Sequence, residues 1–229
     1  KRSLLPELLE KAAAIPGVAW LRVLYCYPDE VDSRLLAVMA AHENICRYID
    51  LPLQHADPDV LRRMHRRGDM AQVRAFLTEA RDLGFTLRTT MIVGFPGETD
   101  EAFARLLAFI KDLQFDRLGA FAYSVEENTP AAVMPDQVPE ETKQKRLDTL
   151  MALQQDISLS RNRLRVGQTE RALITGRQAD GTLVARTAAE APDADGLLYL
   201  RGDENLQPGD FVTARITGAD TYDLTGVIP

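Results

Sequence analysis

Between residues 20 and 124 the chain alternates short apolar runs with longer amphipathic segments, and this alternation limits the folds that it can adopt. The apolar runs cover residues 20–27, 48–54, 87–95 and 118–123 and are rich in Leu, Ile, Val and aromatic residues. Because they are apolar on successive residues, they predict strands that are buried on both faces. Strands separated by helices pair in parallel, so the sequence predicts an α/β domain.

Two amphipathic segments carry clear signals for the start of a helix. Asp69 is a suitable N-cap with Gln72 three residues later, and Gly84 marks the end of that helix. Thr99 opens the next helix with acidic residues in its first turn, and residues 31–42 predict an earlier one. The expected buried residues of the two capped helices are Val73, Phe76, Leu77, Ala80, Leu83, Phe103, Leu106, Leu107, Ile110 and Leu113.

Four strand–helix units are too few to close an eight-stranded barrel. We therefore expect part of a β/α barrel or of a doubly wound sheet. The chain also lacks an initiator Met and begins inside a helical pattern, so we expect it to be part of a longer protein.

A long helix and a small all-β domain complete the predicted fold. Residues 139–165 predict the helix, with Pro139 at its first position and an apolar stripe of Leu147, Leu150, Met151, Ile157 and Leu164. After Gly167, glycines separate five predicted strands near residues 168–176, 181–188, 196–201, 210–217 and 222–228. Such a segment predicts a small β-barrel. We expect one domain over residues 1–165 and a second over 166–229.

The composition is ordinary for a folded protein, with 45% hydrophobic and 27% charged residues. No apolar run approaches the roughly 18 residues of a membrane span, and no signal peptide is recognisable, so we expect no membrane association. Cys26 and Cys46 are the only cysteines, which is too few for a disulfide framework. We expect two buried thiols and a cytoplasmic protein.

The formal net charge of −7 is unevenly distributed. From Gly167 to the end of the chain, five arginines stand against ten acidic residues, which gives that segment a charge of −5. A segment of this charge repels the phosphate backbone of a nucleic acid and suits a basic partner.

Residues 89–99 end a predicted strand in a Gly-Phe-Pro-Gly turn and begin a helix at once. Ligands of α/β sheets bind at the carboxyl ends of strands, although a turn without a ligand fits the same spacing. Gln54 lies at another strand end, where its amide can both donate to and accept from a ribose or carboxylate. We expect its neighbour His55 to be a hydrogen-bonded structural residue, because no metal-ligand cluster accompanies it.

Two further polar runs leave their roles open. Residues 62–67 (RRMHRR) are strongly basic, which is typical of a solvated helix end or of a site for a phosphate or an acidic partner. Tyr123 and Ser124 follow the last strand and can face a pocket, with Glu126 and Glu127 at its rim. Without an identifiable partner base, an acid–base role for this pair is not favoured. No nucleophilic triad or phosphate-binding loop is recognisable.

These segments together resemble the methylthiotransferases of the radical-SAM superfamily. The resemblance covers residues 48–68 (YIDLPLQHADPDVLRRMHRRG), 91–99 (MIVGFPGET) and 119–131 (GAFAYSVEENTPA). Residues 190–200 (EAPDADGLLYL) with Tyr222, Asp223 and Leu224 resemble the C-terminal TRAM domain of that family. The resemblance implies a partial TIM-like radical-SAM barrel followed by a small OB-like TRAM barrel.

Two branches of this family differ in their target. One modifies adenosine in transfer RNA, and the other (RimO-type) modifies the β-carbon of an aspartate in small-subunit ribosomal protein twelve. The Leu-Pro-Leu-Gln-His-Ala, Glu-Glu-Asn-Thr-Pro-Ala and Ala-Pro-Asp-Ala-Asp-Gly segments resemble the ribosomal-protein branch. The charge of the last domain also favours a basic ribosomal protein over transfer RNA as its partner.

The resemblance implies S-adenosylmethionine and two four-iron four-sulfur clusters as cofactors of the whole protein. A cluster needs thiolate ligands, and Cys26 and Cys46 do not match the Cys-x3-Cys-x2-Cys loop of the family. We therefore expect no metal ligand and no catalytic residue in this chain, and no activity from it alone. The implied S-adenosylmethionine contacts are Gln54, Arg88, Val93, Gly94, Phe95, Tyr123 and Ser124, with Gly97 and Glu98 supporting the turn.

Three functions remain to be compared. The first is the ribosomal-protein methylthiotransferase, and the second is a transfer-RNA methylthiotransferase, which a basic face on the small barrel would favour. The third is a non-catalytic RNA- or protein-binding module that has kept the fold. An intact cysteine loop in the full-length sequence separates the enzymes from the module.

Overall fold

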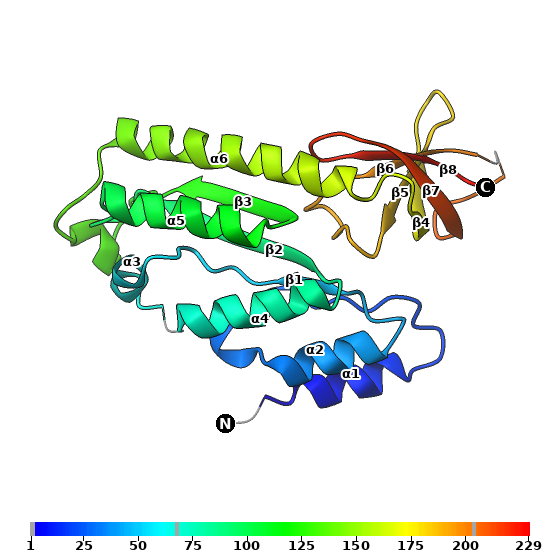
Figure 1. Ribbon diagram of the computed structural model, residues 1–229, viewed down its shortest axis with the longest axis horizontal. Helices are drawn as coiled ribbons and strands as arrows, with labels where there is room; N and C mark the ends of the chain where they lie inside the picture. Colours follow the sequence, from blue (N-terminus) through cyan, green and yellow to red (C-terminus); the bar gives the residue numbers. More distant parts are fainter. Residues whose placement is uncertain (1–2, 67–68, 203–204) are drawn as a thin grey trace. The chain divides into compact units, whose positions relative to one another are not determined.

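The computed structural model describes residues 3–66, 69–202 and 205–229 (Figure 1). The chain forms two compact units, Lys1–Gln154 and Gln155–Pro229. The first unit contains helices and a parallel sheet, and the second contains a barrel of antiparallel and parallel strands. The predicted class, an α/β domain followed by a small all-β barrel, is confirmed.

The sheet of the first unit has three parallel strands in the order β1-β2-β3. They are β1 (Tyr48–Asp50), β2 (Thr86–Val93) and β3 (Arg117–Ala122). Tyr48 lies opposite Thr86 on the β1–β2 side, and Thr89 lies opposite Leu118 on the β2–β3 side. Because the strands are parallel, their carboxyl ends lie at one edge of the sheet, where loops gather.

Helices connect these strands, and both predicted N-caps are confirmed. Asp69 accepts a hydrogen bond from the Ala71 N–H at the start of α4 (Met70–Asp82), and Thr99 accepts from the Ala102 N–H at the start of α5 (Asp100–Leu113). The other α-helices are α1 (Leu5–Ala13), α2 (Ser33–Ala41), α3 (Pro58–Arg63) and α6 (Glu140–Arg163), and the 3₁₀ turns are η1 (Pro28–Glu30) and η2 (Pro130–Val133). Figure 1 shows α4 and α5 lying along the sheet.

The prediction of a strand over residues 20–27 is wrong. Among the described residues this segment pairs with its neighbours at separate points, such as a bridge between Leu21 and Ile45 and a 2.9 Å hydrogen bond from the Cys26 N–H to the Asp50 carbonyl. Between these points Tyr25 adopts a φ of 60°, a left-handed conformation that interrupts extended backbone. The apolar run therefore covers the outer side of β1 without joining the sheet as a strand.

The prediction that the strands are buried on both faces is confirmed for β1 but wrong for β2 and β3. Along β2 buried and half-buried residues alternate, so that Leu87, Thr89 and Met91 face the core. Thr90 and Ile92 point to the other side, where a cavity lies. The second face of β2 carries Thr86, Arg88, Thr90 and Ile92, so it is mainly polar, and its last two residues line this cavity.

Several predicted helix faces need smaller corrections. Leu83 and Leu164 are exposed, because each lies where its helix ends. Phe103 and Leu107 are only half-buried, while Ala102 and Phe109 of α5 are buried instead. The buried side of α6 is largely polar. Besides Leu150 and Ile157 it contains Lys143, Arg146, Gln154, Ser158 and Asn162.

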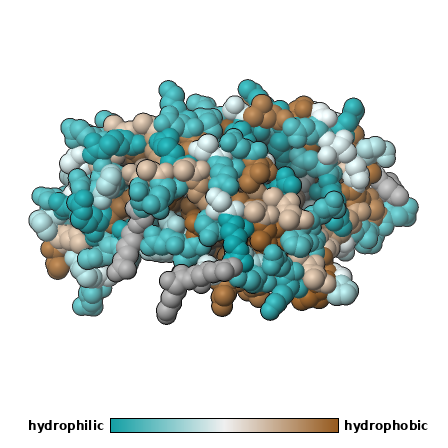
Figure 2. All heavy atoms as spheres, turned by 60° about the horizontal axis from the view of Figure 1, so that its bottom comes forward, coloured by the Kyte–Doolittle hydropathy of each residue, from teal (hydrophilic) through white to brown (hydrophobic). Residues whose placement is uncertain are grey.

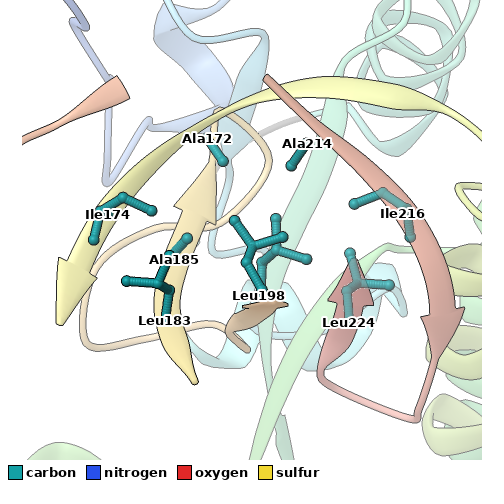
Figure 3. Packing of buried hydrophobic residues seen from close by; sticks show 9 residues of the cluster. Ala172, Ile174, Leu183, Ala185, Leu198, Ala214, Ile216 and Leu224 are labelled. Atoms are coloured by element: carbon teal, nitrogen blue, oxygen red, sulfur yellow. The ribbon is translucent and has the colours of Figure 1, made fainter. Parts of the chain in front are cut away.

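All five predicted strands of the second unit are present. They are β4 (Thr169–Arg177), β5 (Leu183–Thr187), β6 (Leu198–Arg201), β7 (Phe211–Ala219) and β8 (Leu224–Val227), closed into a barrel in the order β4-β5-β6-β8-β7. Figure 3 shows the side chains that fill the barrel pointing toward one another. They are Ala172, Ile174, Leu183, Ala185, Leu198, Leu200, Ala214, Ile216 and Leu224. Alternate residues along each strand supply this core.

A buried ion-pair network lies beside this core. Arg165 donates to both carboxylate oxygens of Glu170 at 2.9 and 2.8 Å and pairs with the buried Glu190. Glu190 also accepts hydrogen bonds from the Thr187 N–H and hydroxyl, at 2.9 and 2.7 Å. The network ties the end of α6 to β4 and to the turn after β5.

The surface is mainly polar. Figure 2 shows one face on which hydrophilic residues predominate and apolar residues form patches between them. In the described part of the chain, no helix is long and apolar enough to cross a membrane.

Candidate functional site

A cavity of about 660 Å³ lies at the carboxyl ends of β2 and β3. Thr90 and Ile92 of β2, Ala122 at the end of β3, and Tyr123 and Ser124 just after it form one part of its wall. The residues that follow α3 and the segment around η2 form the rest. Its volume lies within the roughly 300–1,000 Å³ that is typical of small-molecule sites.

Gln54 enters this cavity through strained backbone. Its φ is 71°, which is unusual for a residue other than glycine and costs on the order of 1–3 kcal/mol. Two hydrogen bonds to β2 hold it there, from its N–H to the Thr90 carbonyl at 2.8 Å and from the Ile92 N–H to its own carbonyl at 2.7 Å. The sheet thus keeps the Gln54 side chain in the wall of the cavity.

The turn after β2 depends on two glycines with positive φ. Gly94 has a φ of 73°, and a Cβ atom there would clash with the side chain of Lys143. Gly97 has a φ of 82°, and a Cβ atom there would clash with the guanidinium of Arg63. Any larger residue at either position is strained and crowded. The absence of side chains lets Lys143 and Arg63 pass close to the turn.

Glu98 closes this turn from inside the protein. Its fully buried carboxylate accepts a hydrogen bond from the Gly94 N–H and lies 3.4 Å from the Arg146 guanidinium. Arg146 also donates to the Glu98 carbonyl at 3.0 Å. Burial raises the pKa of Glu98, while the charge of Arg146 opposes that shift. The contacts agree with the expected role of Glu98 in supporting the turn.

His55 lies next to Glu98 and is completely buried. Its Nδ1 accepts a hydrogen bond from the Asp57 N–H at 2.9 Å, which places the proton of the neutral ring on Nε2. Nε2 is 4.0 Å from the Glu98 carboxylate and has no hydrogen-bond partner among the described residues. Burial lowers the pKa of His55 to about 4, so the ring is neutral at pH 7. This geometry confirms the expected structural histidine.

Tyr123 and Phe95 form the aromatic part of the wall. Their rings meet edge to face with centroids 5.1 Å apart, and the Lys143 ammonium lies 5.4 Å from the centre of the Tyr123 ring. The Tyr123 hydroxyl is shielded from solvent and has no hydrogen-bond partner among the described residues. Since an unpaired buried hydroxyl costs free energy, a polar ligand atom can compensate it.

The remaining predicted residues lie elsewhere. Val93 is fully buried in the sheet core, and neither Val93 nor Gly94 is among the described residues that line the cavity. Arg88 is not among the described residues that line the cavity, and its guanidinium pairs with the buried Asp50 at 3.0 Å. Glu126 and Glu127 are exposed and also absent from that lining.

Lys143 and Arg146 were not predicted at this site. Both belong to α6. The sequence predicts an apolar stripe along this helix, but its buried positions also carry charged and amide side chains. Thr129 and Met134 also line the cavity. The sequence around them gives no sign of a binding role. The basic run over residues 62–67, at the end of α3 and after it, contributes Arg63 and Arg66 to the lining of the cavity. Arg67 lies outside the described residues.

No group of three or more His, Cys, Asp or Glu side chains suited to a metal ion is present in the described ranges. The sequence contains only Cys26 and Cys46, and both are buried as expected. Burial raises the pKa of Cys26 to about 11, so its thiol stays protonated. Two inert thiols do not fit a cluster that needs three thiolates on one loop.

Two family models match the chain in the order of its units. The model of the radical SAM superfamily matches residues 2–110, and that of the TRAM domain matches residues 166–228. Among solved structures, the coproporphyrinogen III oxidase HemN from Escherichia coli, a radical SAM enzyme, is similar in fold with a TM-score of 0.54. That similarity covers 80% of this chain and 48% of the other at 20% identity, so it concerns the fold alone.

Curated relatives are much closer in sequence. The chain is 47% identical over 226 residues to the ribosomal protein uS12 methylthiotransferase RimO of Desulfitobacterium hafniense (strain Y51), covering 98% of this chain and 51% of that relative. It is 48% identical over 227 residues to the protein of the same name from Desulforudis audaxviator (strain MP104C), covering 98% and 50%. The chain thus spans about half the length of these relatives. It belongs to the radical SAM superfamily, groups there with proteins named RimO, and ends in a TRAM domain.

Proposed function

We propose that the protein to which this chain belongs methylthiolates the β-carbon of an aspartate in ribosomal protein uS12 (small-subunit ribosomal protein twelve). The observation that carries this proposal is 47–48% identity to RimO proteins along 98% of the chain. We further propose that residues 1–165 supply part of the S-adenosylmethionine pocket and that residues 166–229 form the TRAM domain, which the family match from residue 166 supports.

The cavity at the ends of β2 and β3 fits S-adenosylmethionine. Gln54 and Ser124 offer polar groups, Phe95 an apolar surface, and Tyr123 a buried hydroxyl that lacks a partner among the described residues. We assign these four side chains to the ligand, with backbone contacts from Val93 and Gly94. We do not extend the assignment to Arg88, because its guanidinium pairs with Asp50.

When bound, S-adenosylmethionine supplies the methyl group and the radical chemistry for which the superfamily is named. The residues of this chain position it and exclude water. Glu98 and Arg146 hold the Gly94–Gly97 turn in shape, and the strained backbone of Gln54 holds its amide in the wall. None of these groups needs to gain or lose a proton for that role.

The iron–sulfur clusters must be held outside this chain, since its two cysteines cannot provide three thiolates. We therefore propose that this chain alone is inactive. The sequence has only two cysteines, too few for a disulfide framework, which supports a reducing cytoplasm as the place of action.

We propose that the TRAM domain binds the basic ribosomal protein. Its formal charge of −5 supports this preference. Part of that charge is neutralised within the second unit, because Glu170 and Glu190 form ion pairs with Arg165. Among the described residues from Gly167 onward, four acidic side chains and four arginines are exposed. The preference therefore depends on net charge at long range rather than on an acidic patch.

One observation favours transfer RNA as the alternative target. A groove of about 470 Å³ on the barrel is lined by Tyr199 and Arg201 together with Gln178 and Thr217. An aromatic ring beside a guanidinium suits an unpaired base and a phosphate. This groove is the basis for including transfer RNA in the test.

The test uses the full-length protein with reconstituted clusters. Mass spectrometry after reaction should detect the methylthio group on ribosomal protein uS12 and not on transfer RNA. Modification of transfer RNA alone would assign the protein to the transfer-RNA branch of the family. Failure to cleave S-adenosylmethionine would favour the non-catalytic binding module.

The cofactor site is tested separately by calorimetry. Gln54→Ala in the full-length protein should weaken S-adenosylmethionine binding by roughly 3- to 10-fold, the contribution of about one hydrogen bond. Glu127→Ala, at an exposed position outside the described cavity lining, should leave the affinity unchanged. Equal affinities for all three proteins would contradict the assignment of the cavity.

A further inference from the structure

The mouth of the cavity is positively charged. Sixteen described residues line the cavity, among them Arg63, Arg66 and His65, and none of the sixteen is acidic. Asp136 lies 3.5 Å from Arg63, but both side chains are well exposed, so this pair is weak. The mouth therefore attracts an anionic group.

The chain positions Arg66 by ending α3 in a specific turn. The Met64 N–H donates to the Val60 carbonyl and the Arg66 N–H donates to the Leu61 carbonyl, both at 2.9 Å. His65 between them has a φ of 53°, the left-handed conformation of a helix C-terminal turn. A non-glycine residue in this conformation stores strain, which local contacts must offset.

Arg66 is also supported by an aromatic ring from another part of the chain. Its guanidinium lies 5.4 Å from the centre of the Tyr27 ring, in the range of a cation–π contact. Within the described residues, Arg66 has no acidic partner. Its planar fork of donors is thus held in place and remains available to a ligand.

The surroundings indicate the class of that ligand. Besides Arg63 and Arg66 the wall contains Met64, Phe121 and Met134, which offer no hydrogen bonds from polar side-chain groups. Of these, Phe121 is 62% exposed, so it lies at the open side of the cavity, whereas Phe95 is 7% exposed. A small planar anion with an apolar stem fits this arrangement, and a guanidinium binds a carboxylate through two parallel hydrogen bonds.

We propose that Arg66, with Arg63 beside it, binds the carboxylate of the target aspartate at the mouth of the cavity and so determines the specificity for that residue. This inference rests on the proposed function. The methionine part of S-adenosylmethionine carries the same chemical group, so the test must distinguish the two sources. An RNA phosphate is disfavoured here, because the lining includes the apolar side chains of Met64, Phe121 and Met134 and a nucleic acid backbone stays hydrated.

The test measures binding by the full-length protein with reconstituted clusters. The ligands are S-adenosylmethionine, a peptide containing the target aspartate, and the same peptide with that aspartate changed to asparagine. Arg66→Gln should weaken binding of the aspartate peptide by roughly 10- to 100-fold, as expected for lost charge-assisted hydrogen bonds, and abolish the preference over asparagine. Binding of S-adenosylmethionine should change by less than about 3-fold, below the contribution of one hydrogen bond.

Arg62→Gln is the matched control. Arg62 lies in α3, four residues before Arg66, pairs with the exposed Asp59 at 2.6 Å and does not belong to the described cavity lining. Its substitution should leave all three affinities unchanged, and Arg66→Lys should restore part of the affinity for the aspartate peptide. Circular dichroism checks that each variant folds.

Three results would overturn the proposal. They are unchanged peptide binding in Arg66→Gln, an equal loss for both peptides, and loss of S-adenosylmethionine binding alone, which would assign the carboxylate to the cofactor. If the unsubstituted protein does not methylthiolate uS12 at all, the proposed function fails. If it does and Arg66→Gln binds normally, only the role of Arg66 fails.

Discussion

At the scale of single residues, the site depends on backbone conformations that few amino acids tolerate. Gln54 and His65 adopt left-handed backbone without being glycine, and Gly94 and Gly97 have positive φ as well. Strain of this kind persists only where surrounding contacts hold it, and such residues concentrate at functional sites. We therefore expect substitutions at these residues to lower the free energy of unfolding more than substitutions elsewhere in the chain.

Gly94→Ala should destabilise the first unit by about 2–5 kcal/mol, because strain at positive φ adds to crowding in a packed region. The clash is with the buried stem of Lys143. Gly17→Ala is the control, since Gly17 has a φ of 87° but no atom within 4 Å of an added Cβ. It should cost only the backbone strain. Urea denaturation followed by the fluorescence of Trp20 measures both, and equal losses would contradict the clash.

His55 should make the first unit sensitive to acid. Its pKa falls from 6.5 to about 4 on burial, so the unfolded chain takes up the proton first. Stability is complete above pH 6.5 and decreases as the pH falls toward 4, by about 3 kcal/mol at most. The raised pKa of Glu98 acts in the opposite direction, so the comparison must be with a variant.

His55→Gln serves as that variant, because its amide oxygen can still accept from the Asp57 N–H. Urea denaturation of both proteins between pH 7 and pH 4 should show a smaller acid loss in the variant. Parallel curves would mean that His55 keeps its ordinary pKa in the folded protein.

At the scale of elements, the end of α6 is joined to the barrel by ionic contacts. Arg165→Gln should destabilise the second unit by about 3–5 kcal/mol, because it leaves the buried Glu190 without its partner. Arg163→Gln, two residues earlier and exposed, should change stability by less than about 0.5 kcal/mol. Urea denaturation followed by far-ultraviolet circular dichroism measures both variants. Similar midpoints would show that the network does not stabilise the barrel.

At the scale of the whole molecule, the two edge strands of the sheet in the first unit differ in how far other segments cover them. The segment that includes Leu21 and Cys26 partly covers β1, whereas β3 pairs only with β2 among the described strands. Phe121 on β3 is 62% exposed. An uncovered edge with an apolar residue favours pairing with another chain.

The isolated chain should therefore associate at micromolar concentration, and light scattering should show a mass that rises with concentration. Phe121→Lys should reduce this association, since a charge on an edge strand opposes pairing. Val133→Lys is the control, at an exposed position outside the sheet. A monomer at all concentrations, or equal effects of the two substitutions, would contradict an open edge at β3.

Apart from the strand expected over residues 20–27, the sequence by itself determined the order of the main elements, both N-caps and the β-barrel. These features depend on neighbouring residues: Asp69 and Thr99 bond to N–H groups within three positions, and the barrel strands alternate core and surface residues. Gln54, Tyr123 and Ser124 were indicated by their places at strand ends, whereas Phe95 was implied by the family resemblance, and all four line the cavity.

Only the tertiary structure decided the rest. The run over residues 20–27 has the composition of a strand, but its pairing depends on distant partners and on the left-handed Tyr25. The pairing of Arg88 with Asp50, and the approach of Lys143 and Arg146 to the Gly94–Gly97 turn, join residues about 40 to 50 positions apart. Such contacts leave no periodic pattern in the sequence, because they are chosen by packing in three dimensions.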